Sequence, residues 1–248
     1  MAAAVRDRNF KLLYQPIVEI STGQLQHFEA LLRLDGHDSP ADAIHLAEEL
    51  DLVADLDLAV LDEVIAKLKA SRRDVCVAAN ISGRSLSLPQ FREALLGKLK
   101  SVGWLSGRLM LEITETAALG DLGQANAAIQ QMRKLGHRIF LDDFGAGSAS
   151  MAYLRALSVD AVKIDGQYVR DLHLSERNRA LVRHIAELCR ELEVDVIGEH
   201  VETQEVADVL QDLGVRFGQG WRFGKPASEP VYRGITEQRV RRIGEVAA

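Results

Sequence analysis

Residues 12–34 read LLYQPIVEISTGQLQHFEALLRL and decide how the fold begins. Two apolar runs, 12–20 and 24–34, are joined here by Ser21-Thr22-Gly23. A short link that contains glycine between two such runs is typical of a β-hairpin, so we expect the chain to start with antiparallel strands.

After the hairpin, helical patterns alternate with short apolar runs. Apolar residues recur at spacings of three and four over residues 53–68, 181–192 and 206–213, which predicts helices. The runs between helices predict six buried strands, at 75–79, 108–111, 138–141, 161–164, 194–197 and 215–217. Near-continuous apolar runs suit parallel strands that are covered on both faces. Six strands after a hairpin give about eight, so we expect an α/β fold with a closed barrel rather than an open sheet.

The composition favours a single domain. The 248 residues are 47% hydrophobic and no linker divides them, so we expect one domain over 1–248, with terminal extensions at 1–9 and 236–248. The formal net charge of −6 argues against a general binder of duplex nucleic acid or anionic membranes. The two cysteines, Cys76 and Cys189, lie in apolar surroundings, which suits a reducing compartment. Without a long apolar segment, we expect a cytoplasmic protein that makes no membrane contact.

Polar side chains stand at the ends of the predicted strands. They are Glu29 within the second run, and then Asn80, Glu112, Asp142, Asp143, Lys163, Asp165, Glu199 and Gln219. The carboxyl ends of parallel barrel strands converge on one face, where active sites are built. We therefore expect these side chains to meet in one acidic bowl.

Crowded carboxylates repel one another, and a divalent cation relieves that repulsion. Carboxylate and amide oxygens without a Cys/His set favour Mg²⁺ or Mn²⁺, and the number of carboxylates suits two ions. Each acid alone is equally well explained as a helix N-cap, but the recurrence at strand after strand favours a site. In contrast, five acids interleave with a helical apolar stripe and predict a solvated face: Glu48, Glu49, Asp51, Asp55 and Asp57.

Several motifs, in this order, resemble those of the EAL-domain phosphodiesterases. They are Gln15-Pro16-Ile17-Val18, Glu29-Ala30-Leu31-Leu32-Arg33, Asn80-Ile81-Ser82, Glu112-Ile113-Thr114-Glu115, Asp142-Asp143-Phe144-Gly145-Ala146-Gly147, Lys163-Ile164-Asp165, Glu199, Val201-Glu202-Thr203 and Gln219-Gly220. The resemblance extends from about Phe10 to Pro226. It implies a modified TIM barrel with the first strand antiparallel, and hydrolysis of cyclic di-GMP to linear 5′-pGpG by a metal-activated water.

The resemblance also implies a role for each residue of the site. Two Mg²⁺ or Mn²⁺ ions would be held by Glu29, Asn80, Glu112, Asp142, Asp143 and Glu199. The catalytic residues would be Glu29, Lys163, which orients the attacking water, and Glu199, the candidate general base. Substrate binding would fall to Gln15, Arg33, Asp165, Glu202 and Gln219, and Glu115 would support the loop over 142–148.

The sequence also departs from the family pattern. His200 stands where glycine is usual, Ser148 where an aromatic residue is common, and Leu34 where tryptophan is common. The His200 side chain either crowds the metals or takes a harmless orientation, and we expect the latter. Trp221 either flanks a guanine base or packs in the core.

Two further function classes stay open. One is a catalytically inactive receptor module that binds cyclic di-GMP without turnover, and the other is an unrelated metal-dependent barrel enzyme. Because every implied metal-ligand position is filled, we favour the enzyme. We also expect a homodimer, and an upstream sensory or cyclase-like domain in a longer parent protein.

Overall fold

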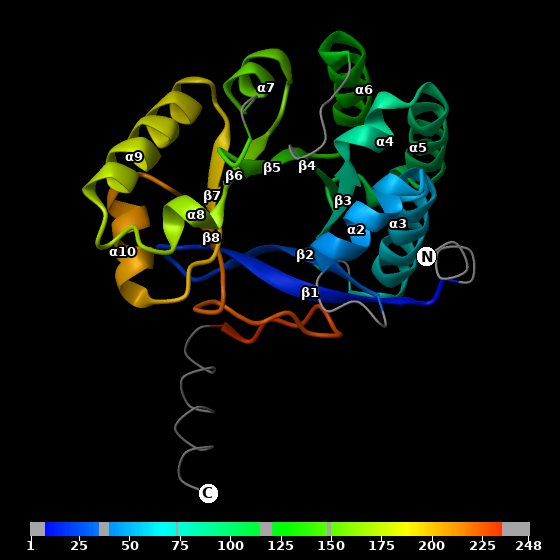
Figure 1. Ribbon diagram of the computed structural model, residues 1–248. Coiled ribbons are helices and arrows are strands. Elements are labelled where there is room, and N and C mark those ends of the chain that lie inside the picture. Colours follow the sequence, from blue (N-terminus) through cyan, green and yellow to red (C-terminus); the bar gives the residue numbers. More distant parts are fainter. Residues whose placement is uncertain (1–7, 35–39, 73, 115–120, 148–149, 235–248) are drawn as a thin grey trace, which may run out of the picture.

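The computed structural model describes residues 8–34, 40–72, 74–114, 121–147 and 150–234. Eight strands form a closed barrel in chain order, with helices around the outside (Figure 1). The strands are β1 Phe10–Glu19, β2 Leu25–Leu34, β3 Val77–Ser82, β4 Leu109–Thr114, β5 Ile139–Phe144, β6 Ala161–Ile164, β7 Asp195–Gly198 and β8 Phe217–Gln219. The predicted barrel is confirmed.

Helices follow most of the strands and cover the barrel. They are α2 Pro40–Glu49, α3 Val53–Ala70, α4 Gly83–Ser87, α5 Pro89–Ser101, α6 Leu122–Lys134, α7 Ser150–Ala156, α8 Gly166–Val169, α9 Glu176–Glu191 and α10 Gln204–Asp212, with a 3₁₀ turn at Gly103–Leu105. Among the helices that the structure describes, none combines the length and the apolar character needed to cross a bilayer.

The first strand runs against its two neighbours. β1 pairs antiparallel with both β2 and β8, whereas the other neighbouring strands pair in parallel. The predicted hairpin is therefore confirmed, and Gly23 in its turn has a φ of 69°, which favours glycine. The register places Gln15 opposite Glu29, so two predicted site residues from one hairpin lie side by side.

The strands extend further than the apolar runs predict. We expected ends at residues 79, 111 and 141, but β3, β4 and β5 continue to Ser82, Thr114 and Phe144. In these segments Asn80 donates to Glu29, and Glu112 and Asp142 contact Lys163, so their polar groups have partners inside the barrel. The β5–β6 pairing shifts register between Leu141 and Phe144, and the other ladders continue past the apolar runs. Consequently Asn80, Glu112 and Asp142 project from rigid strands rather than from loops.

The barrel interior has an apolar layer next to a polar one. The apolar layer consists of Ile17, Ala78, Met110, Phe140, Ala161, Ile197 and Phe217. Each of these residues lies two positions from a polar site residue, and side chains two apart on a strand face the same way. The polar residues are Gln15, Asn80, Glu112, Asp142, Lys163, Glu199 and Gln219. Packed apolar side chains thus support the polar layer from one side.

Two glycine substitutions test how closely the end of β8 packs. A Cβ at Gly220 would lie 2.1 Å from the Val201 carbonyl oxygen and 2.3 Å from its nitrogen. We expect Gly220→Ala to lower the free energy of unfolding by about 2–3 kcal/mol, measured by urea denaturation. The matched control is Gly97→Ala in α5, where a Cβ meets nothing within 4 Å and the better helix former raises stability by up to about 1 kcal/mol. Equal effects of the two substitutions would contradict this packing.

Candidate metal centre

The Lys163 ammonium lies at the centre of a ring of carboxylates. Lys163 projects from β6 into the barrel, and its side chain is 1% exposed. Its Nζ lies 2.9 Å from Glu112 Oε2, Asp142 Oδ1 and Glu199 Oε1, and 3.0 Å from Glu29 Oε2. Burial lowers the pKa of Lys163, but these four carboxylates outweigh the burial and raise it well above its ordinary value. Lys163 is therefore a fixed positive charge.

Side-chain amides surround Glu29. Asn80 Nδ2 donates to Glu29 Oε1 at 2.8 Å, and Gln219 Nε2 donates to Glu29 Oε2 at 2.6 Å. Gln219 Nε2 also approaches Gln15 Oε1 at 3.3 Å, and Gln15 Nε2 donates to the Gly224 carbonyl at 3.2 Å. Burial raises the pKa of Glu29, yet Lys163 and the two amides bring it below its ordinary value, so Glu29 is ionised.

The positive charge near Glu112, Asp143 and Glu199 is too small to keep these three carboxyl groups ionised. Burial, with smaller contributions from Glu29 and Asp142, raises the pKa of Glu112 well above its ordinary value. Burial and Asp142 likewise raise the pKa of Glu199 to about 8 and that of Asp143 to about 6. One lysine therefore does not neutralise this group of acids.

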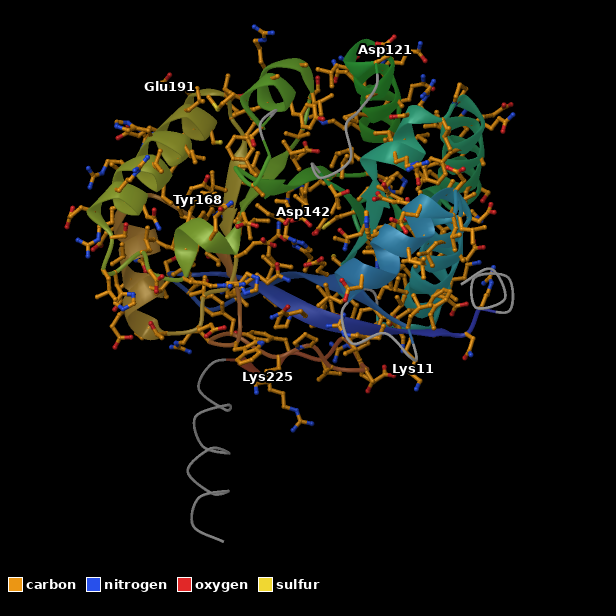
Figure 2. The ribbon with its side chains drawn as sticks, in the orientation of Figure 1. Lys11, Asp121, Asp142, Tyr168, Glu191 and Lys225 are labelled. Atoms are coloured by element: carbon orange, nitrogen blue, oxygen red, sulfur yellow. The ribbon has the colours of Figure 1, made fainter. Side chains whose placement is uncertain are left out.

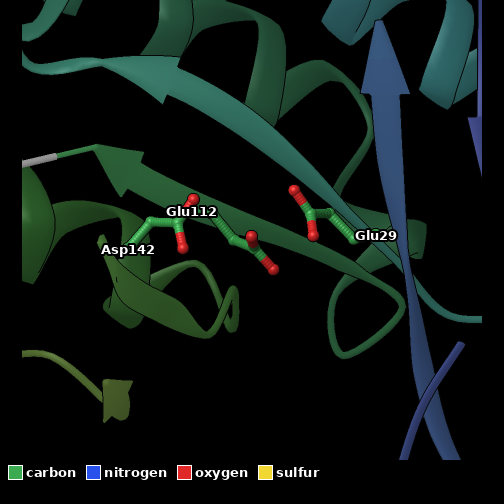
Figure 3. A group of neighbouring side chains, drawn as sticks. All are labelled: Glu29, Glu112 and Asp142. Atoms are coloured by element: carbon green, nitrogen blue, oxygen red, sulfur yellow. The ribbon is translucent and has the colours of Figure 1, made fainter. Parts of the chain in front are cut away.

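The donor set fits hard divalent cations. Ligand atoms of Glu29, Glu112 and Asp142 lie within 4.8 Å of one another, and so do those of Asp142, Asp143 and Glu199. Figure 3 shows Glu29, Glu112 and Asp142 together at the strand ends of the barrel. Because the two groups share Asp142, the arrangement is compatible with two ions. The oxygen Asn80 Oδ1 is buried and has no hydrogen-bond partner among the described residues, so it is available as a further ligand.

Two hollows flank these carboxylates. One has a volume of about 600 Å³ and reaches between α2 and α3, and the other has about 330 Å³ and extends to Trp221. Glu29, Leu31, Arg33 and Asp143 line both hollows. In Figure 2, Asp142 lies between α8 and α2, at the opening of the barrel.

The other predicted site residues have varied surroundings. Arg33 Nη1 donates to the Leu32 carbonyl at 2.7 Å, and Glu202 is exposed in the smaller hollow. The Asp165 carboxylate accepts from Gln167 N at 2.7 Å, so Asp165 is the N-cap of α8. For this acid the N-cap alternative of the sequence analysis therefore holds. Glu115 and Ser148 lie outside the described residues.

His200 and Trp221 border the smaller hollow. His200 has a φ of 52°, in the left-handed region that favours glycine. Its ring lies over Gly166, where a Cβ would be 2.3 Å from the ring, and Arg170 Nη2 lies 3.4 Å from both ring nitrogens. Trp221 is 52% exposed with Lys225 Nζ 4.5 Å above its ring, so the core-packing alternative for Trp221 is wrong.

The sequence analysis missed two buried polar residues. His27 is completely buried, with Nε2 3.7 Å from Glu112 Oε1, and its position two residues before Glu29 was the available signal. Asp57 is 8% exposed and accepts from Ser82 N at 2.9 Å, so the predicted solvated face is wrong at this residue. Burial raises the pKa of Asp57 to about 7. Its helical spacing to the buried residues Leu61 and Leu68 could have indicated this.

Comparisons with known proteins agree with this geometry. The family model described as EAL domain matches residues 1–226. The cyclic di-GMP phosphodiesterase PdeB of Shewanella oneidensis is 34% identical over 234 residues, which is 91% of this chain and 27% of PdeB. The chain spans between 27% and 39% of the length of the curated relatives that it matches here.

Solved structures share the fold over nearly the whole chain. An EAL domain protein from Listeria monocytogenes EGD-e has a TM-score of 0.82 and 26% identity, covering 98% of this chain and 95% of that one. Klebsiella pneumoniae BlrP1, in a complex with manganese and cyclic di-GMP, has a TM-score of 0.77 and 28% identity, covering 91% of this chain and 59% of that one.

The raised pKa values predict how stability depends on pH. The pKa of Glu199 rises from its ordinary 4.5 to about 8 in the folded protein, and that of Asp143 from 3.8 to about 6. The folded state therefore holds more protons than the unfolded state over this range, so its stability falls as pH rises. The lowered pKa values of His27, His137 and His200 act in the opposite sense up to about pH 7. We therefore expect the free energy of unfolding in EDTA to fall from pH 7 to pH 8, and Mg²⁺ or Mn²⁺ to reverse the loss at pH 8.

Urea denaturation across this pH range, with and without the cation, measures the effect. Asp57→Asn removes the independent contribution of the pKa of Asp57, which is about 7. In that variant, stability in EDTA that does not fall with pH, or that a divalent cation leaves unchanged at pH 8, would contradict the interpretation of the cluster.

Proposed function

The chain belongs to the EAL domain family, and from this premise we propose that it hydrolyses cyclic di-GMP to linear 5′-pGpG. The observation that carries the proposal is the crowding of four carboxylates around Lys163 Nζ, beside two hollows that are both lined by Glu29 and Asp143. Cations would offset the repulsion among these carboxylates. The two hollows offer room for a dinucleotide on both sides of the carboxylate cluster. PdeB, a relative at 34% identity, is named a cyclic di-GMP phosphodiesterase.

Two Mg²⁺ or Mn²⁺ ions complete the site in this proposal. Their ligands are Glu29, Asn80, Glu112, Asp142, Asp143 and Glu199. When bound, such ions lower the pKa of water and stabilise negative charge on a phosphate. The all-oxygen donor set and the manganese in the BlrP1 structure support this assignment.

The reaction is a hydrolysis at phosphorus. A water oxygen bonds to the phosphorus and the bond to the 3′ oxygen breaks. That oxygen takes a proton from solvent water, and the proton lost by the attacking water returns to the solvent through Glu199. Glu199 would accept the proton that the attacking water loses. Its pKa is about 8 without cations, and Mg²⁺ or Mn²⁺ bound beside it would lower that pKa and leave the carboxyl ionised. Lys163 Nζ, 2.9 Å from Glu199 Oε1, orients this base, while Glu29 holds its ligand position through two amide donors.

Substrate binding follows the two hollows. Arg33 lines both, so its guanidinium can contact a phosphate that lies between them. The exposed face of Trp221 offers a stacking surface for a guanine base. The remaining proposed contacts are Gln15, Asp165, Glu202 and Gln219, and Glu115 is proposed to support the loop over 142–148.

A receptor that binds cyclic di-GMP without turnover is the second candidate. His200 favours it, because this side chain stands where the family usually has glycine. The complete set of carboxylates favours the enzyme.

We also propose the wider setting of the domain. Residues 1–248 form one barrel domain with extensions at 1–9 and 236–248, within a longer protein that carries a sensory or cyclase-like domain upstream. Two free cysteines and a net charge of −6 support a cytoplasmic location without binding of duplex nucleic acid or membranes. An apolar hollow of about 410 Å³ includes Met151 and Leu181, which are 58% and 42% exposed, and offers a surface for a homodimer.

Product analysis tests the proposed reaction. We expect the purified chain to convert cyclic di-GMP to 5′-pGpG with Mg²⁺ or Mn²⁺, as seen by chromatography, and not in EDTA. Glu29→Ala removes a cation ligand and Glu199→Gln removes the base, so each lowers turnover at least about 100-fold.

The matched control is Asp208→Asn, an exposed acid on α10 whose loss leaves turnover unchanged. Glu29→Ala prepared in the same way also excludes a contaminating nuclease. Saturable binding of intact cyclic di-GMP without product would assign the receptor function, and absence of binding would contradict both.

A further inference from the structure

We propose that His27 is a positioning residue for Glu112. From inside the barrel it holds oxygen Oε1 of the Glu112 carboxylate, while oxygen Oε2 faces the cation site. The inference rests on the proposed function, because it concerns the same metal centre. It adds a residue that stands outside the set of ligands and substrate contacts.

His27 has an unusual place in the fold. It comes from β2, is completely buried, and its ring centroid lies 5.1 Å from that of Phe140, a member of the apolar interior layer. The alternation of strand side chains puts it on the same side as Glu29. A polar ring among apolar residues is costly unless its nitrogens have partners, so its contacts explain why it is tolerated.

The ring has one partner on each side. The partner of Nδ1 is the side-chain oxygen Oε1 of Gln26, which accepts from Nδ1–H in this rotation of the amide. Nε2 lies 3.7 Å from Glu112 Oε1, and among the described residues neither of these two atoms has a hydrogen-bond partner. The other oxygen, Glu112 Oε2, lies 2.9 Å from Lys163 Nζ in the carboxylate cluster. The two oxygens of Glu112 thus face in different directions, one toward His27 and one toward the cluster.

A neutral ring is sufficient for this role. The Gln26 amide presents an N–H donor or an oxygen to Nδ1 depending on its rotation, so it accommodates either tautomer. Cations bound at the cluster would lower the pKa of Glu112, and its ionised carboxylate would then favour the tautomer with the proton on Nε2. A shift of about half an ångström brings the 3.7 Å separation to an ordinary hydrogen-bond distance. With the Gln26 amide rotated by 180°, its N–H replaces Oε1 and donates to His27 Nδ1, and His27 Nε2–H donates to Glu112 Oε1.

This hydrogen bond fixes the rotation of a ligand carboxylate. Groups that hydrogen-bond to metal ligands typically change metal affinity by about 10- to 100-fold when they are removed. Replacing His27 by leucine keeps an apolar side chain of suitable size in an apolar layer, so the variant is expected to fold.

Calorimetric titration of the metal-depleted full chain with Mn²⁺ tests the proposal. We expect His27→Leu to weaken Mn²⁺ binding about 10- to 100-fold, and His27→Gln, whose amide N–H can replace Nε2–H, to recover most of the affinity. Phe217→Leu is the matched control, since it alters the same apolar layer through β8. It should leave Mn²⁺ affinity unchanged. In a Glu112→Gln background, His27→Leu should have no further effect, because its action passes through Glu112.

Three results would overturn the inference. Mn²⁺ affinity of His27→Leu equal to that of the unaltered chain would show that the contact has no role. Equal losses of Mn²⁺ affinity in His27→Leu, His27→Gln and Phe217→Leu would show that His27 contributes only through packing. An unaltered chain that binds no Mn²⁺ would remove the proposed metal centre itself, whereas binding that is insensitive to His27 would leave that centre intact.

Discussion

The structure depends on one buried ammonium that meets four carboxylates. Lys163 Nζ lies within 3.0 Å of acids from four other segments, so this single charge holds several strands' side chains in one arrangement. Such a group is costly to bury unless its charges balance, and here the negative side is in excess. Burial, reinforced by this excess of negative charge, raises the pKa values of Glu112, Asp143 and Glu199. A further positive charge at the site would relieve both effects.

The barrel places these groups accurately because they project from strands. β1 runs antiparallel and brings Gln15 opposite Glu29, and Ile17 opposite Gln219, which closes the ring of hydrogen bonds around Glu29. Beneath the polar residues, the apolar interior layer leaves little room for them to rearrange. The polar side chains of the site are thereby held in place by packed apolar residues, while the two neighbouring hollows can accommodate a ligand.

Much of this arrangement could be predicted from the sequence. The glycine-containing link and the alternating runs predicted the hairpin, about eight strands and the closed barrel, because those features depend on local pattern. The strand ends were predicted too early, since Asn80, Glu112 and Asp142 resemble turn residues until their interior partners are known. Asp57 and His27 were missed because burial of a polar side chain depends on contacts that composition does not report. Their positions at the predicted strand ends located the acids, the resemblance assigned a role to each, and only the structure pairs their oxygen atoms.

The central claim is that this carboxylate cluster is a metal centre, and anomalous diffraction from crystals soaked in Mn²⁺ tests it most directly. The account predicts anomalous peaks within about 2.5 Å of the carboxylate oxygens, one among Glu29, Glu112 and Asp142 and one among Asp142, Asp143 and Glu199. Absence of any peak there, with Lys163 keeping its four carboxylate contacts, would contradict it.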